Sequence, residues 1–273
     1  DEAKQAMRSI ENIYLDKGDA TGYIRYATGT NIGDLSTSEQ DSRAFSTATT
    51  LFSRGNYQGA VEAVNAYFDK FPKPIQEKYA RFIRAESNAA LGKNQEALHD
   101  YNIILNDWTS AYTERALVSV SQLYLKQKQY NEAVQQLKKL ELTSEYKSNY
   151  AYAINNLLIS YFNIGDYKET LNYAALVKNY EKSSEEEIAT AHLYAAKAYL
   201  ATSKPAEATK ELNLAALKSK TATGAEARYL VAEQQLKAKE YDKAIKSAFD
   251  ISDTFSSYDY WVAKGFILMA DAY

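Results

Sequence analysis

The chain has 273 residues, a formal net charge of −3, an isoelectric point near 5.6 and no cysteine. The lack of cysteine excludes disulfides and thiolate metal sites, and the slight acidity argues against general nucleic-acid binding, in which Lys and Arg neutralise phosphates. Hydrophobic residues make up 46% and charged residues 25%, as in globular proteins. No apolar run reaches the roughly 18 residues of a transmembrane helix, and the three prolines and ten glycines leave room for long helices.

The first elements along the chain are irregular. Residues 3–14 predict a helix, "DKGDA" predicts a turn, and a second, shorter helix is expected to end near Thr28. The polar stretch "GTNIGDLSTSEQDS", residues 29–42, predicts a connector. We therefore divide the chain into residues 1–40, an irregular helix pair with a polar connector, and residues 41–273, a regular array.

The array begins with a helix pair at residues 41–53 and 57–70. Apolar residues of the second helix recur with helical period. Gly55 suits a backbone of positive φ that ends the first helix, and Asn56 is expected to cap the second. Pro72 is expected to stop it.

The same arrangement returns along the whole chain. The turns read "GNYQGA", "KQYNEA", "GDYKET" and "EYDKA", and the small residue after each turn recurs every 36 to 38 positions. That row is Tyr23, Ala60, Ala97, Ala133, Thr170, Ala208 and Ala244. A second row, nine positions earlier, is Tyr14, Leu51, Asn88, Tyr124, Tyr161, Tyr199 and Gln235. One two-helix unit cannot bury its own apolar face, so we expect the units to stack, with small residues at close helix crossings.

This pattern resembles the tetratricopeptide repeat (TPR). The resemblance implies an all-α fold, a right-handed superhelical solenoid of about seven antiparallel helix pairs, with the last repeat incomplete at Tyr273. Two features depart from the family pattern. The period exceeds the usual 34 or so residues, and the first-helix tryptophan is replaced by Ala44, Leu117, Ile154 and Phe266. The longer period, with "AYFDKFP" closing a helix, resembles variants in bacterial envelope proteins, including outer-membrane assembly lipoproteins and the periplasmic partner of the Tol–Pal system.

Residues that carry chemistry are sparse. His99 and His192 lie in different repeats without a partner at metal-ligand spacing, and both are expected to be surface or packing residues. "SSEEEIA" is read as a helix start capped by Ser183 or Ser184, with acidic residues in the first turn. No glycine-rich phosphate loop is found. We therefore expect no catalytic residue, metal or cofactor, and no enzymatic activity.

The resemblance places a binding surface on the concave face, which the first helix of each repeat lines. The predicted partner-binding residues are Arg115, Gln122, Tyr152, Asn155, Ile159, Lys197 and Tyr229. Aromatic residues on these rows favour a peptide held by stacking and apolar contact, or they pack between neighbouring helices. A clamp for a C-terminal carboxylate, built by Arg115, Asn155 and Lys197, is disfavoured because acidic residues share the rows, namely Glu86, Glu226 and Glu233.

The sequence thus predicts a non-catalytic scaffold that binds a protein or peptide, in a segment of a larger bacterial envelope protein. The alternative is a structural spacer or assembly arm in a periplasmic or outer-membrane complex. The expected location is periplasmic or outer-membrane-associated, with a cytoplasmic location left open. The sequence starts at Asp1 without Met or an apolar leader, so we expect a processed or shortened chain. Phe266, Met269 and Tyr273 are expected to contact a neighbouring molecule or to be partly exposed.

Overall fold

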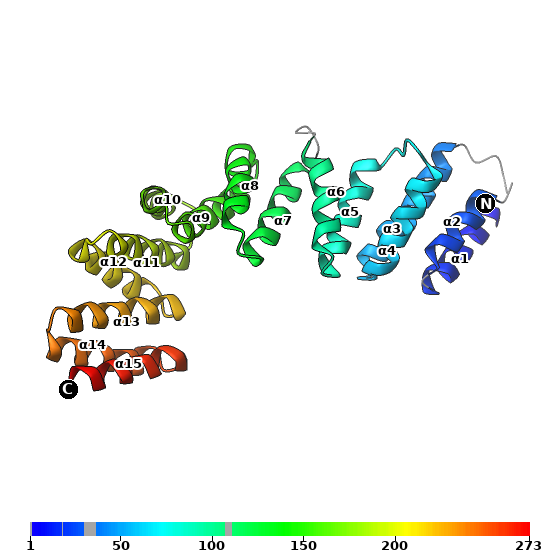
Figure 1. The fold of residues 1–273 in the computed structure, drawn as a ribbon. Helices are drawn as coiled ribbons and strands as arrows, with labels where there is room; N and C mark the ends of the chain where they lie inside the picture. The colour runs from blue at the N-terminus through cyan, green and yellow to red at the C-terminus, as the bar shows by residue number, and fades with distance from the viewer. Residues whose placement is uncertain (1, 18, 30–36, 107–110) are drawn as a thin grey trace. The chain divides into compact units, whose positions relative to one another are not determined.

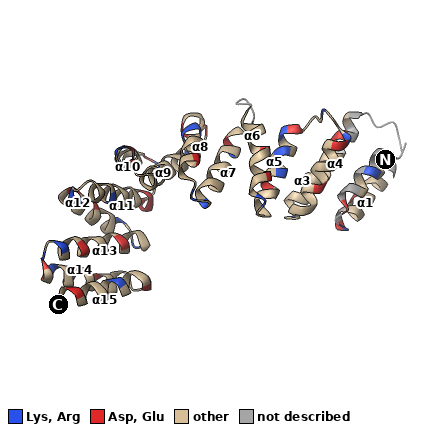
Figure 2. Ribbon diagram, in the orientation of Figure 1, with Lys and Arg blue, Asp and Glu red and all other residues tan. Residues whose placement is uncertain are grey.

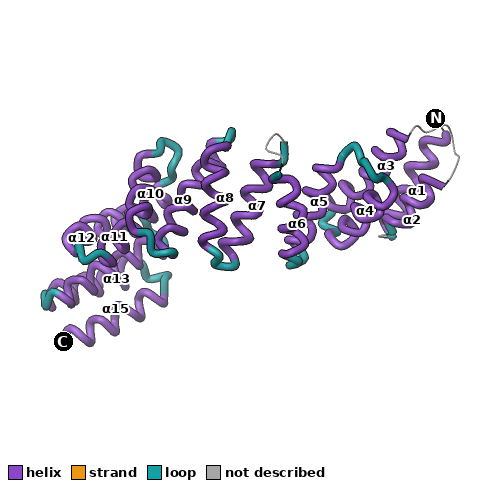
Figure 3. Tube along the Cα trace, turned by 45° about the horizontal axis from the view of Figure 1, so that its top comes forward, coloured by secondary structure: helices purple, strands orange, loops and turns teal. Residues whose placement is uncertain are grey.

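The computed structural model describes residues 2–17, 19–29, 37–106 and 111–273. In these ranges the chain consists of helices joined by short loops and turns, without a strand (Figure 3), so the predicted all-α class is confirmed. The helices are α1 (Glu2–Asp16), α2 (Ala20–Gly29), α3 (Thr37–Ser53), α4 (Tyr57–Lys70), α5 (Glu77–Ala90), α6 (Asn94–Leu105), α7 (Thr113–Lys126), α8 (Tyr130–Thr143), α9 (Lys147–Asn163), α10 (Tyr167–Asn179), α11 (Glu185–Ala201), α12 (Pro205–Lys218), α13 (Ala222–Lys237), α14 (Tyr241–Thr254) and α15 (Asp259–Ala272).

The chain forms two compact units, Asp1–Leu123 and Tyr124–Tyr273, with the boundary inside α7. Within each unit, consecutive helices pack as antiparallel pairs (Figure 1). The first helices of neighbouring pairs also contact one another: α1, α3 and α5 in the first unit, and α9, α11, α13 and α15 in the second. In each unit we call the surface of these odd-numbered helices, with the part of α7 that belongs to the unit, its first-helix face. The division at residue 40 stays a prediction.

Six turns share one backbone conformation at the position that ends the first helix. Gly55, Gly92 and Gly165 have φ between 74° and 82°, which confirms the prediction for Gly55. Three residues with a Cβ hold the same place in other repeats, with φ between 57° and 62°: Lys128, Ser203 and Lys239. The left-handed conformation is thus required by the turn, and glycine is only the easiest way to supply it.

The predicted helix ends in the array are largely confirmed. Helix α4 spans Tyr57–Lys70, as expected, and its N-terminus is capped by Asn56, whose Oδ1 accepts a hydrogen bond from the Gly59 amide at 3.0 Å. Ser184 caps α11 in a capping box with Glu187, which settles the choice between Ser183 and Ser184.

The connector prediction is partly wrong. Helix α3 begins at Thr37, four residues before the expected start at Asp41, so the end of the polar stretch is helical. The polar composition was read as a loop, although Glu39 and Gln40 are good helix formers. Residues 30–36 of the predicted connector lie outside the described residues.

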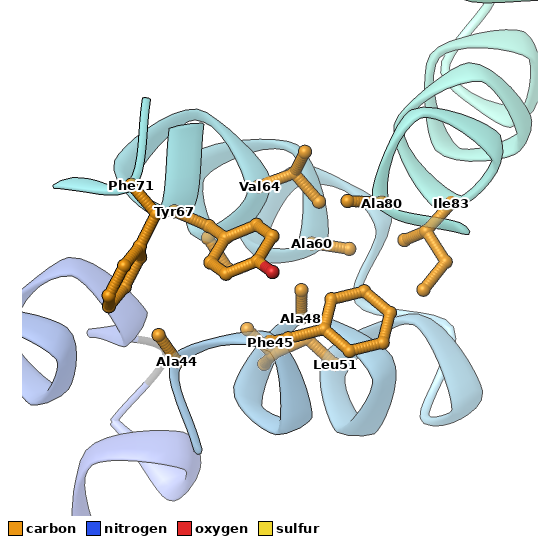
Figure 4. Close-up of a cluster of buried hydrophobic side chains, with 11 residues drawn as sticks. Ala44, Phe45, Ala48, Leu51, Ala60, Val64, Tyr67, Phe71, Ala80 and Ile83 are labelled. Atoms are coloured by element: carbon orange, nitrogen blue, oxygen red, sulfur yellow. The ribbon is translucent and has the colours of Figure 1, made fainter. Parts of the chain in front are cut away.

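The core confirms the predicted register of small residues. Every member of the row from Tyr23 to Ala244 is fully buried. Figure 4 shows the pattern in one repeat, where the α3 and α4 side chains meet and Ala80 and Ile83 of α5 join them. A polar link fixes the same region: the Tyr67 hydroxyl donates to Asp41 Oδ1 at 2.6 Å, and the Ile75 amide donates to Asp41 Oδ2 at 3.1 Å. Asp41 is therefore a buried tie between α3 and the turn after α4.

Apolar side chains remain accessible on the last helix. Phe266 is 51% exposed and Tyr273 93% exposed, whereas Met269 packs against the cluster of Ala232, Ala244 and Leu268. Partial exposure was one of the two predicted outcomes for these residues. None of the helices described is both long and apolar enough to cross a membrane.

Candidate partner-binding face

The first unit carries an aromatic strip on its first-helix face. Phe45 of α3 meets Tyr79 of α5 at 5.2 Å between ring centroids, and Tyr79 stacks on Tyr112 at 5.1 Å. Tyr112 also stacks on Phe82 at 5.6 Å, and the Arg115 guanidinium lies 4.3 Å from the Phe82 ring centroid. Phe45 and Phe82 are buried, so these two pack between helices as the alternative reading expected. Tyr79 and Tyr112 are half-buried and contribute surface.

A fixed carboxylate lies in the same first-helix region. Glu86 Oε1 accepts hydrogen bonds from the Tyr101 hydroxyl and from Ser119 Oγ, each at 2.6 Å. Burial, followed by the negative charge of Glu86, raises the pKa of Tyr101, so this phenol stays protonated and keeps donating. Gln122, on the same helix as Ser119, is exposed. Arg115 and Gln122 thus offer polar surface, while Glu86 is held in place.

In the second unit the predicted site residues begin on α9. Asn155 is buried, and its Nδ2 donates to Glu187 Oε1 of α11 at 2.7 Å. This bond ties two neighbouring first helices together. Tyr152 and Ile159, about one turn away on either side, are half-buried. Asn155 therefore serves as a link between helices, and its two neighbours form the accessible surface.

The next part of this face lies on α11 and α13. Lys197 Nζ pairs with Glu226 Oε1 at 2.5 Å and lies 4.9 Å from the ring centroid of Tyr194. Burial, followed by the charge of Glu226, raises the pKa of Tyr194. Lys197 is paired with Glu226 and Asn155 is bonded to Glu187, so a terminal carboxylate would have to compete with a carboxylate already bound to each. The pairing agrees with the expectation that acidic residues dilute such a clamp.

A small pocket of about 160 Å³ opens between α13 and α15. Its lining consists of Tyr229, Glu233, Leu236, Lys264, Ile267, Leu268 and Asp271. Lys264 Nζ lies 4.5 Å from the ring centroid of Tyr229 and 5.7 Å from those of Tyr260 and Trp261. The pocket therefore combines the cation of Lys264, the ring of Tyr229 and the carboxylates of Glu233 and Asp271 on the first-helix face.

Sequence reasoning missed four aromatic residues of this face: Tyr112, Tyr194, Tyr260 and Trp261. Tyr112 precedes α7 and so lies outside the helical rows that were counted. Tyr260 and Trp261 are four and three residues before Lys264, a helical spacing that would have indicated them. Arg115 and Gln122 belong to the first unit and the other five predicted residues to the second, so the two sets are described separately.

Other charged groups are mixed in sign along the helices (Figure 2). His192, buried as expected, contacts Glu211 Oε2 through Nδ1 at 2.5 Å, and Lys178 Nζ lies 3.1 Å from the same carboxylate. His99 is exposed. No group of three or more His, Asp or Glu in the described part of the chain could hold a metal ion.

These features define a helical-repeat protein in which, within each unit, the first helices of stacked pairs contact one another. The tetratricopeptide-repeat family model matches residues 45–111, and a search of curated protein sequences found no significant match. Solved structures with similar folds are TPR proteins, so the fold is that of a TPR solenoid.

Three solved structures illustrate the likeness. The C-terminal part of a TPR protein from Cytophaga hutchinsonii has 13% identity and a TM-score of 0.64, over 94% of this chain and 98% of that one. YrrB, described as a TPR protein with an unusual peptide-binding site, has 16% identity and a TM-score of 0.53, over 66% of this chain and 86% of that one. MamA has 16% identity and a TM-score of 0.52, over 65% of this chain and 91% of that one. At these identities the likeness concerns the fold alone.

Proposed function

We propose that the chain is a non-catalytic scaffold that binds a peptide or a partner protein on its first-helix face. The observation that carries the proposal is the set of half-buried aromatic side chains next to charged groups on this face, in both units. Aromatic side chains supply large contact area at low entropic cost, and cations placed against rings add orientation. The peptide-binding site ascribed to YrrB, a protein of similar fold, supports the same use of this architecture.

We further propose that the chain is a segment of a larger bacterial envelope protein, periplasmic or associated with the outer membrane. The support is the 36- to 38-residue period and its resemblance to envelope variants of the repeat. Fractionation of cells that express the full-length gene tests this location. Recovery with the periplasmic or outer-membrane fraction supports it, and recovery only with the cytoplasm rejects it.

Site-specific photo-crosslinking in the native cell tests the binding face. A photoreactive amino acid replaces Gln122 or Ile267, which are exposed on first helices, or Leu142 or Leu217, which are exposed on the second helices α8 and α12. We expect the positions of Gln122 and Ile267 to crosslink the same partner protein. The positions of Leu142 and Leu217 should crosslink none. Capture only from Leu142 and Leu217 would reject the proposal.

A second candidate is an assembly arm that contacts a neighbouring molecule through α15. The exposure of Phe266 and Tyr273, next to the half-buried Met269, favours it. Sedimentation velocity over a range of protein concentrations tests it. A concentration-dependent dimer that the double change Phe266→Ser and Tyr273→Ser abolishes supports the arm. A monomer at all concentrations argues against self-association through this surface.

A further inference from the structure

An open pocket of about 540 Å³ lies among α4, α5 and α6 of the first unit, and no function has been assigned to it above. Its walls include Val61 and Asn65 of α4, Arg84 and Asn88 of α5, and Asp100 of α6. We call it the α4–α6 pocket. Its volume falls in the usual range of ligand sites, roughly 300–1,000 Å³.

The repeat register explains why this pocket exists. Asn88 occupies the row position at which three later repeats carry a tyrosine: Tyr124, Tyr161 and Tyr199. Each of those tyrosines packs against a core cluster. Asp100 occupies, in the second helix, the position of Tyr173 in a later repeat, three residues after the small-residue row.

In the repeat of α9 and α10, two tyrosines occupy the corresponding positions. Tyr161 and Tyr173 stack there with ring centroids 5.4 Å apart. In the α4–α6 pocket both rings are absent, because an amide and a carboxylate replace them. The row's other amide, Gln235, has a buried Oε1. Asn88 is thus a member of the row that borders an open pocket.

Asn88 is a polar side chain of the pocket wall without a protein partner. The residue is only 5% exposed, and the hydrogen bonds of the described residues include none to its side-chain amide. Its amide is not among the buried polar atoms that lack a partner, so a ligand that hydrogen-bonds Asn88 takes the place of solvent there. The side chain lines the pocket, so a bound group can reach it from there.

The rest of the wall also includes Lys93, Gln95, Glu96 and His99, and the formal charges of Arg84, Lys93, Glu96 and Asp100 balance. Arg84 donates to Asp100 through Nε at 2.6 Å and Nη2 at 2.8 Å, and through Nη1 to Asn65 at 2.7 Å. Arg81 adds a contact to Asp100 at 3.2 Å, and the Phe68 ring centroid lies 4.9 Å from the Arg84 guanidinium carbon. Because Asp100 neutralises the guanidinium, the wall favours an uncharged ligand with a flat ring over a free anion.

We propose that the α4–α6 pocket binds a tyrosine side chain of a partner protein. The ring replaces the aromatic volume that Asn88 and Asp100 leave open, and the phenol hydroxyl pairs with the Asn88 amide. The site is on α4, α5 and α6, and is distinct from the first-helix strip of Tyr79 and Tyr112. It is therefore an additional contact and does not depend on the scaffold proposal.

The test uses the whole 273-residue chain and N-acetyl-tyrosinamide as the probe, with titration followed by two-dimensional NMR. We expect saturable shifts at the side-chain amides of Asn88 and Asn65. N-acetyl-phenylalaninamide should bind about 3- to 10-fold more weakly, the value of one hydrogen bond, and N-acetyl-leucinamide more weakly still. Absence of binding, or shifts confined to Tyr79 and Tyr112, would overturn the site. Equal binding of the tyrosine and phenylalanine probes would overturn the assignment to tyrosine.

Two substitutions at Asn88 sharpen the test. Asn88→Tyr places a ring in the pocket, as in the later repeats. It should weaken the affinity for N-acetyl-tyrosinamide at least about ten-fold. Asn88→Leu keeps the size and removes the hydrogen bond, so it should erase the preference for tyrosine over phenylalanine even if Asn88→Tyr fails to fold. The control is Asn102→Tyr on α6, an exposed position outside the pocket, which should leave binding unchanged. Unchanged binding in both Asn88 variants contradicts the proposal.

Discussion

At the residue scale, the turns require a left-handed backbone conformation, but they do not require glycine to supply it. Gly165 adopts φ of 82° and has open space where a Cβ would lie, so any penalty for a side chain there comes from the backbone alone. Lys128, Ser203 and Lys239 bear that penalty in the native chain. Their repeats are held in register by packing, which outweighs the local cost.

Gly165→Ala is expected to lower the free energy of unfolding by about 1 kcal/mol, because a Cβ disfavours the left-handed region. Lys239→Gly should raise it, by up to about 1 kcal/mol, for the same reason. Chemical denaturation measures both. Gly29→Ala in helix α2, where glycine has no positive φ and no near neighbour, serves as the control and should not destabilise the protein. Equal losses at Gly165 and Gly29 would reject the explanation.

Tyr67→Phe tests the buried tie to Asp41. Removing the hydroxyl leaves the Asp41 carboxylate without its 2.6 Å donor while the ring still fills the core. We expect a loss of about 1–3 kcal/mol, the cost of an unsatisfied buried polar group. Thermal or chemical unfolding measures it, and Tyr241→Phe at an exposed tyrosine is the matched control. A neutral Tyr67→Phe would mean that the bond contributes nothing.

At the element scale, the register of small residues determines how closely the helices approach. Ala133 is fully buried in the cluster formed by Leu137, Ile154 and Leu157. Ala133→Leu should overpack this crossing and cost about 1–3 kcal/mol. Ala263→Leu, at an exposed position of α15, controls for the change in helix propensity and should be near neutral. An unchanged melting temperature for Ala133→Leu would show that the register is wrong.

Carboxylates between helices make stability depend on pH. Burial opposes ionisation of Glu211, but hydrogen bonds from His192 and Lys178 outweigh it and hold its pKa below the ordinary value of 4.5. Hydrogen bonds from Thr223, Ser219 and Thr221 outweigh burial in the same way and lower the pKa of Glu186.

A carboxylate with a lowered pKa stabilises the fold fully above its unfolded pKa, and the contribution is lost as pH falls through the folded value. The free energy of unfolding should therefore fall as the pH drops below about 4.5. Glu211→Gln should make this fall shallower, and Glu207→Gln, at an exposed position of α12, should not. Chemical denaturation at several pH values around 4.5 measures the free energy of unfolding of both variants. If it depends on pH identically in the two variants, the lowered pKa of Glu211 does not cause the fall.

The sequence predicted the helix pairs because each repeat constrains the same few positions. Small residues, turn residues and helix caps are local or periodic signals, and those at Gly55, Asn56 and Ser184 are confirmed. The start of α3 was missed because the polar residues 37–40 were assigned to the connector, although Glu39 and Gln40 favour a helix. Tyr112 was missed because its position depends on Tyr79 and Phe82, which are distant in sequence. The α4–α6 pocket could not be predicted from the sequence, because an Asn in a row of aromatic residues does not show whether neighbouring side chains fill the space.

At the scale of the whole molecule, each helix pair contributes one first helix and one second helix to its unit. In each unit the first helices contact one another, and their surface includes aromatic and charged groups such as Tyr79 and Lys264. Since the helix contacts found among the described residues join neighbouring pairs, substitutions in distant repeats should have additive effects on stability within about 0.5 kcal/mol. The first-helix face is thus free to vary in chemistry while the register of small residues keeps the fold.

The affinity of the crosslinked partner segment for single cation variants tests the central claim most directly. Calorimetry compares the wild type with Arg115→Ala and Lys264→Ala on first helices, and with Lys168→Ala and Lys210→Ala, exposed on the second helices α10 and α12. A scaffold that binds through its first-helix face predicts an affinity at least about ten-fold weaker, roughly 1.4 kcal/mol, for one or both of the first pair. The Lys168 and Lys210 variants should match the wild type. Wild-type affinity for Arg115→Ala and Lys264→Ala, together with weaker binding by Lys168→Ala or Lys210→Ala, would contradict it.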